Sequence, residues 1–172
     1  MLGKWFAYMA AALFLCLGIS GCSEKPRQTM SEAEKKYLGT AQKGNASAQY
    51  HLAVCYYKGL GVGQDMKQAA NWFYQAAKQN HPKAQYQLAE CWYNGLGVEE
   101  ENHQEAAFWY RKAADNGLDK AQYKLGLCYM EGDGVKQDPQ EANKWLKRAM
   151  DQGYKPAHDA WVKSVHMIVG VY

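Results

Sequence analysis

One short motif occurs three times in this chain and constrains the fold more than any other feature. It reads CYYKGLGV from Cys55, CWYNGLGV from Cys91 and CYMEGDGV from Cys128. The tripeptide AQY recurs with the same period, and a further alanine continues the series; the four positions are Ala48, Ala84, Ala121 and Ala157. Self-similarity of this kind is the signature of a repeat architecture, in which one structural unit is built several times.

Each unit predicts two helices joined by a turn. In the first helix, apolar residues recur at i, i+4 and i+8, which places Ala48, Leu52 and Tyr56 on one helical face. Gly59 then predicts a left-handed C-cap. The second helix begins at an Asp or Asn suited to N-capping and carries small Ala residues beside a Trp. These tryptophans are expected in the core, at Trp72, Trp109 and Trp145.

A lone helix pair of this size cannot bury both of its faces, so the units are expected to stack. The predicted fold is all-α: an α/α solenoid of stacked helix-turn-helix repeats. Full units are expected over residues 48–83, 84–120 and 121–156, flanked by capping half-units over 31–47 and 157–172. The apolar end MIVGVY is expected to pack over the last unit, with a partner-binding tail as the alternative.

The first 21 residues have the length and apolar character of a signal peptide. They end in ISGC, Ile19 to Cys22, which resembles the lipobox of bacterial lipoproteins. That resemblance implies lipidation of Cys22, and Ser23 in place of Asp points to the outer membrane. Residues 22–30 would then be the lipidated Cys and its tether. The alternative is an ordinary secretory signal with a chance Cys.

The repeat pattern is A-x-x-x-L-[AG]-x-x-Y, then G-x-G-V, then A-x-x-W-[FY]-x-x-A-A. It resembles the Sel-one-like repeat, a relative of the tetratricopeptide repeat, in which Trp92 replaces the usual Tyr and Met150 the usual second Ala. The resemblance implies that the first helices line a concave surface that binds peptides or proteins.

One sector of the first helices changes from unit to unit while the packing sectors repeat. This sector is the candidate partner-binding surface, with no catalytic residue assigned. Its members are His51, Val54 and Lys58, then Gln87, Glu90 and Asn94, then Lys124, Leu127 and Glu131. Because the sector mixes acids and bases, we expect it to recognise a mixed-charge peptide or protein surface rather than a polyanion. A plain solvated face is the alternative.

Motifs for catalysis, metals and cofactors are not found. The chain contains no HExxH, SxxK or CxxC, and its five His residues show no metal-ligand spacing. The glycine turns lack the third Gly of GxGxxG, which weakens a phosphate-loop interpretation. Cys55, Cys91 and Cys128 could suggest a metal or redox site. However, equivalent positions in stacked units lie about 8–10 Å apart, too far for a disulfide, so we expect small half-buried hydrophobes. No metal and no cofactor are therefore expected.

A net charge of +3 is too small to argue for nucleic acid. We therefore expect a non-catalytic scaffold or adaptor, lipid-anchored at Cys22 on the periplasmic side of a Gram-negative envelope. Its expected partner is a protein or peptide. Two alternatives stay open: an envelope enzyme acting on peptidoglycan or β-lactams, and an inhibitor or immunity-type protein that blocks an envelope partner.

Overall fold

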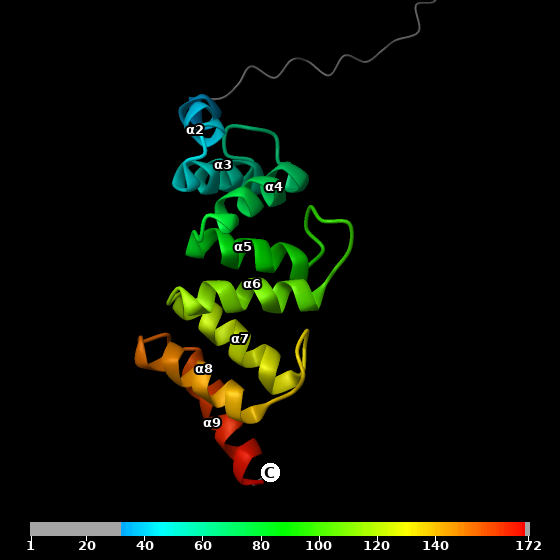
Figure 1. Ribbon diagram of the computed structural model, residues 1–172, viewed down its shortest axis with the longest axis vertical. Helices are drawn as coiled ribbons and strands as arrows, with labels where there is room; N and C mark the ends of the chain where they lie inside the picture. The colour runs from blue at the N-terminus through cyan, green and yellow to red at the C-terminus, as the bar shows by residue number, and fades with distance from the viewer. Residues whose placement is uncertain (1–31, 171–172) are drawn as a thin grey trace, which may run out of the picture.

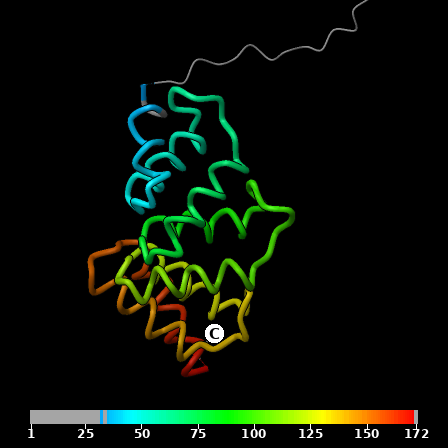
Figure 2. Tube along the Cα trace, turned by 45° about the horizontal axis from the view of Figure 1, so that its top comes forward, coloured from blue at the N-terminus to red at the C-terminus, as the bar shows by residue number. Residues whose placement is uncertain are grey.

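The computed structural model describes residues 32–170, which form eight α-helices and no β-strand. The helices stack along one long axis, and the first and last described helices lie at opposite ends of the stack (Figures 1 and 2). Their bounds are α2 Glu32–Gln42, α3 Ala46–Lys58, α4 Met66–Lys78, α5 Pro82–Tyr93, α6 His103–Asp115, α7 Asp119–Glu131, α8 Pro139–Asp151 and α9 Ala157–Val169. The predicted all-α solenoid is confirmed. The expected signal peptide, lipidated Cys22 and tether lie outside the described residues.

Local sequence signals set the ends of the helices. Asp65 caps α4, because its side chain accepts a hydrogen bond from the backbone N–H of Gln68 at 3.0 Å. Asn102 and Asp138 cap α6 and α8 in the same way. Gly59 ends α3 in the left-handed conformation, at φ 68°. α5 differs slightly, because it ends at Tyr93 and its C-cap is Asn94.

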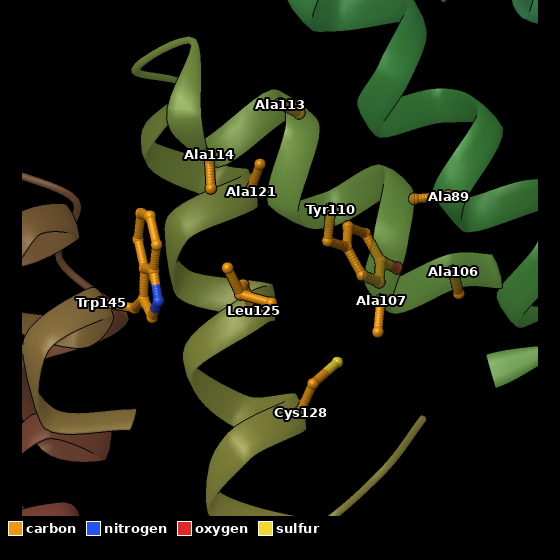
Figure 3. Close-up of a cluster of buried hydrophobic side chains, with 10 residues drawn as sticks. All are labelled: Ala89, Ala106, Ala107, Tyr110, Ala113, Ala114, Ala121, Leu125, Cys128 and Trp145. Carbon is orange, nitrogen blue, oxygen red and sulfur yellow. The ribbon is translucent and has the colours of Figure 1, made fainter. Parts of the chain in front are cut away.

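In each second helix, the largest fully buried side chain belongs to the residue after the tryptophan. Phe73, Tyr110 and Leu146 are fully buried. Of the tryptophans, Trp145 is buried, whereas Trp72 and Trp109 are half-buried. Each of those two contacts two buried clusters, one on either side of a seam between units. Figure 3 shows Trp145 and Tyr110 on opposite sides of Leu125. Trp72 and Trp109 thus join units, and the expectation that the three tryptophans lie in the core holds in full only for Trp145.

A buried glutamine links every unit to the unit before it. Gln85 has no exposed surface. Its Nε2 donates to the carbonyl oxygen of Ala77, near the end of the preceding second helix, at 3.2 Å. Its Oε1 accepts from Nδ2 of Asn116, the C-cap of its own unit's second helix, at 2.9 Å. The other units repeat both bonds, with Gln49 between Ala41 and Gln79 and with Gln122 between Ala114 and Gln152.

The second glycine of the turn allows two units to approach closely. A Cβ on Gly134 would lie 2.0 Å from the backbone oxygen of His103, the first residue of α6. Gly97 meets Met66 at the start of α4 in the same way, at 1.9 Å. The turn of each of these units therefore rests on the preceding unit's second helix, where only glycine fits.

The described part of the apolar end, residues 167–170, does not pack over the last unit as expected, and Val171 and Tyr172 lie outside the described residues. Residues 167–169 form the final turn of α9, which ends at the left-handed Gly170. Ile168 and Val169 are exposed at 41% and 60%. The physical reason is that no helix-ending residue precedes Gly170, so α9 runs on as one straight element. α9 itself covers α8, through Ala157, Ala160 and Ser164.

Gly134 and Gly117 offer a matched test of the close approach. Both are left-handed, at φ 68° and 83°, but a Cβ on Gly117 would meet nothing within 4 Å. Gly117→Ala should therefore cost only the left-handed backbone penalty, about 1–2 kcal/mol. Gly134→Ala should cost about 1–3 kcal/mol more in chemical denaturation, because the turn must move away from α6. Equal losses for the two variants would mean that the units do not approach this closely.

Replacing the buried glutamine should weaken the stack. Gln85→Met keeps the side-chain length but leaves the amide of Asn116 without its acceptor. We expect a loss of about 1–3 kcal/mol in unfolding free energy. Gln87→Met, two residues further on the half-exposed side of the same helix, is the control and should change stability by less than about 0.5 kcal/mol. Identical denaturation midpoints for the two variants would contradict this role.

Candidate partner-binding surface

The candidate surface lies on the first helices of the three units. Eight of its nine residues lie within α3, α5 or α7, and Asn94 is the C-cap of α5. We call it the first-helix face. Its exposed members are His51, Lys58, Asn94 and Glu131, and its half-buried members are Val54, Gln87, Glu90, Lys124 and Leu127.

Three members of this face vary together with the core residue behind them. Val54 packs against the cluster that contains Phe73. Leu127 packs against the cluster that contains Leu146. In the middle unit the core residue is Tyr110, and its hydroxyl donates a hydrogen bond to Glu90. The residue type at these three positions therefore follows the core residue behind it. From the sequence alone, such variation cannot be distinguished from variation that serves binding.

Glu90 is a central polar residue of the first-helix face. In addition to the bond from Tyr110, its Oε1 lies 3.2 Å from Nζ of Lys124 in the next unit. Burial, followed by the hydrogen bond to Glu90, raises the pKa of Tyr110 above the usual tyrosine value. Burial and then the charge of Glu90 raise the pKa of Tyr86 as well. Glu90 and Lys124, which were expected to contact a partner separately, therefore neutralise each other's charge across the boundary between two units.

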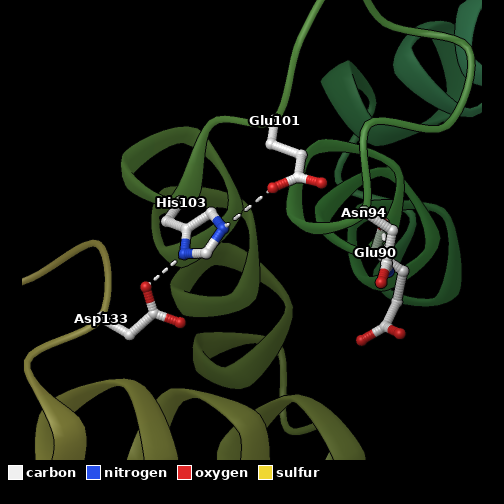
Figure 4. A network of polar contacts seen from close by, with 5 residues as sticks. All are labelled: Glu90, Asn94, Glu101, His103 and Asp133. Atoms are coloured by element: carbon white, nitrogen blue, oxygen red, sulfur yellow. Dashed lines mark hydrogen bonds and ion pairs between the residues drawn. The ribbon is translucent and has the colours of Figure 1, made fainter.

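A second polar contact crosses the same seam, as Figure 4 shows. Nδ1 of His103, at the start of α6, contacts a carboxylate oxygen of Asp133 in the turn after α7. Its Nε2 lies 3.9 Å from Glu101, and its ring stacks on Tyr93 at 4.8 Å between centroids. The sequence signal was Asp133 itself, which stands where the other two turns have Leu60 and Leu96.

The thiols of the repeated motif are buried. Cys91 and Cys128 carry free thiols, and Cys55 is buried at the equivalent position. Burial raises the pKa of Cys91 to about 12, with the charge of Glu90 adding to it. Burial likewise raises the pKa of Cys128 to about 12. Both thiols are therefore protonated at neutral pH, which disfavours metal or redox chemistry through their thiolates.

An open groove of about 390 Å³ lies at one edge of the first-helix face. It shares His51 with that face. The sequence did not identify the other residues around it, although one signal was available: the N-cap position before AQY changes from Asn45 to His81 to Leu118. The groove is lined by Ser47, Tyr50, His51, His81, Pro82, Lys83, Asn116, Gly117 and Leu118.

Within residues 32–170 no group of three or more His, Cys, Asp or Glu side chains could hold a metal ion. No helix in that range combines the length and apolar character needed to cross a bilayer.

Stacked helical hairpins with an exposed face that differs between units define a helical-repeat protein. The model of the Sel1 repeat matches residues 46–81, 82–118 and 119–154, so the chain belongs to the Sel1 repeat family. Proteins of this family are generally protein–protein interaction scaffolds and are typically non-catalytic.

Solved structures of similar proteins support the same fold. A Sel1 repeat protein from Oxalobacter formigenes is 37% identical, with a TM-score of 0.68, over 72% of this chain and 51% of its own length. A protective antigen of uropathogenic Escherichia coli, which displays an SLR fold, is 33% identical with a TM-score of 0.67, over 77% of this chain and 33% of its own. This chain thus spans about half or less of these two relatives.

A more distant similarity extends to the cysteine rich protein B of Helicobacter pylori. It is 21% identical, with a TM-score of 0.57, over 74% of this chain and 90% of its own length, which supports the fold alone. A comparison with curated proteins found no match.

The pairing of Glu90 with Tyr110 can be measured by a double-mutant cycle. Glu90→Val leaves a buried hydroxyl without its acceptor, and Tyr110→Phe removes the donor. The double variant recreates the Val54 and Phe73 combination of the first unit. We therefore expect it to be more stable than the sum of the single effects by about 1–3 kcal/mol.

The control cycle combines Tyr110→Phe with Lys58→Ala, at an exposed residue of α3, three helices before α6. Those effects should add to within about 0.5 kcal/mol. If the first cycle is additive as well, Glu90 is not a partner of the core and its variation needs another explanation.

Proposed function

We propose that this chain is a scaffold that holds a protein or peptide partner on its first-helix face, close to a bacterial membrane. The observation that carries this proposal is the contrast between a repeating framework and a varying face. The buried glutamine of the first helix, the alanine directly before it and the leucine three residues after it are the same in every unit. Two exposed or half-exposed positions per unit are different in every unit.

After the three core-coupled positions are set aside, the face retains six residues with distinct chemistry. One position is imidazole, amide and ammonium in successive units, and the other is ammonium, amide and carboxylate. These residues are His51, Gln87 and Lys124, followed by Lys58, Asn94 and Glu131. Such a linear array of different polar groups on a rigid framework suits recognition of one extended segment, in which a few contacts supply most of the affinity.

The membrane part of the proposal depends on the ISGC motif and the length of chain after it. A lipid on Cys22 would leave residues 22–30 as a tether, which spans about 30 Å when fully extended. The solenoid would therefore work within roughly one protein diameter of the membrane surface. Ser23 after the lipidated Cys favours the outer membrane, with the solenoid facing the periplasm.

Site-specific photo-crosslinking tests the binding face. A photo-reactive residue replaces Gln87 on the first-helix face, Asn71 on the exposed side of α4, or Ile168 at the C-terminal end. Irradiation of cells should give one adduct of defined mass from Gln87 and none from Asn71. Adducts from Ile168 alone would place the partner on the C-terminal end, and adducts from Asn71 would place it on the second helices.

Cys22→Ala tests the anchor separately. The variant should lose its acyl chains, move from the membrane fraction to the soluble fraction or remain uncleaved, and differ in mass from the lipidated wild type. Cys16→Ala, in the apolar part of the signal, is the matched control and should behave as wild type. An unchanged mature mass and unchanged detergent partitioning in Cys22→Ala would refute the anchor without affecting the crosslinking result.

A further inference from the structure

The groove at the edge of the first-helix face has an unbalanced charge. None of its nine lining residues is acidic, and three of them, His51, His81 and Lys83, can carry a positive charge. Lys83 is exposed and makes no ion pair with the described part of the chain. Burial, followed by repulsion from His51 and Lys83, lowers the pKa of His81. The lining therefore holds no acidic side chain, and Lys83 is its one permanently charged residue.

Hydrogen bonding fixes the proton on His81. Its Nδ1 accepts the backbone N–H of Ala84 at 3.2 Å and thereby caps α5. Protonating Nδ1 would destroy this cap and place a positive charge at a helix N-terminus, where the helix dipole disfavours it. His81 therefore remains neutral, and its single N–H is on Nε2, which is the nitrogen available to a ligand.

Aromatic stacking holds the imidazoles in place. The ring of Tyr50 stacks on His81 at 4.8 Å between centroids, with 22° between the planes. Tyr50 also meets His51 edge-on at 5.4 Å, and His51 stacks on Tyr37 at 5.2 Å. A series of four rings thus runs from α2 to the start of α5. Because these rings are already ordered, a ligand that binds here would lose little side-chain entropy.

We propose that this groove binds an acidic side chain, Asp or Glu, of the partner segment that lies along the first-helix face. Lys83 supplies the charge, and Nε2 of His81 supplies a neutral hydrogen-bond donor. Ser47 and Tyr50 line the same groove, and each carries a hydroxyl group that can donate a hydrogen bond. This inference rests on the proposed scaffold function and names the chemistry of one contact within it.

The lining favours a carboxylate over more highly charged groups. Phosphate dianions are usually held by clusters of arginine, whereas this groove has one lysine and no arginine. The volume, about 390 Å³, falls within the range of small ligand sites. A single carboxylate beside apolar surface from Pro82 and Leu118 matches both the charge and the composition of the groove.

The test uses the full chain in a non-ionic detergent and two synthetic peptides. The probe is an acetylated, amidated nine-residue peptide of Gly and Ser with two central Glu residues, and its control has Gln at both positions. Resonances of the histidine rings are followed by two-dimensional NMR during titration. The Glu peptide should shift the ring signals of His81 and His51, and the Gln peptide should bind at least fivefold more weakly.

Variants then assign the contact. Lys83→Gln should weaken the Glu peptide at least fivefold and leave the Gln peptide unchanged. His81→Asn keeps an N-cap, as Asn45 does for α3, and should weaken the Glu peptide at least threefold. Lys78→Gln, at the exposed end of α4, is the control and should have no effect.

Several results would overturn the inference. Equal binding of the two peptides, no effect of Lys83→Gln, or no shift of His81 at millimolar peptide would each do so. Equally tight binding of a Gln peptide with a free C-terminus would reassign the groove to a chain terminus instead of a side chain. None of these results affects the crosslinking from Gln87, so the scaffold proposal and this inference can fail independently.

Discussion

The stack depends on a buried amide that each unit directs at its neighbour. A glutamine in the first helix, such as Gln85, donates to a carbonyl near the end of the preceding second helix and accepts from the C-cap of its own. The carbonyl of Ala77 also accepts the backbone N–H of Asn80 in the turn that follows, so the glutamine adds a second hydrogen bond at the end of that helix. Because the glutamine joins two helix ends at once, it fixes both the register within a unit and the register between units. The tryptophans and the glycine contacts at Gly97 and Gly134 can form only in that register.

A framework fixed in this way limits where the units can differ. Substitutions at the seam must preserve the glutamine bond, the alanines and the glycine approach, so differences accumulate on the solvent side of the first helices. Some of these differences still belong to the core. Val54, Glu90 and Leu127 stand in front of Phe73, Tyr110 and Leu146, and the one polar residue of the first set faces the one hydroxyl of the second. Position on an exposed sector is therefore insufficient evidence of binding.

The sequence predicted the helices, their caps and the stacking because these depend on residues close together in the chain. Asp65, Asn102 and Asp138 act within one turn, and the repeat period requires the units to pack. It could not predict contacts between units, since these join residues about thirty positions apart. The seam position of Trp109 and the contact between His103 and Asp133 are of this kind, and the bond from Tyr110 to Glu90 likewise joins distant residues, 20 positions apart within one unit. The groove was missed for the same reason, because three segments about thirty positions apart in the chain contribute to it.

The groove also shows how a capping position can acquire a second role. Asn45 and His81 both accept the N–H that begins a first helix, but Asn uses its only acceptor oxygen, whereas His retains a second ring nitrogen. At the next unit Leu118 provides no side-chain cap, and the backbone N–H of Lys120 bonds to Asp119 instead. Both side-chain caps leave a donor, but the donor of His81 belongs to a ring that stacks on Tyr50, whereas that of Asn45 belongs to a terminal amide and Leu118 has none. Stacking on Tyr50 then holds that donor where the first-helix face of one unit meets the next.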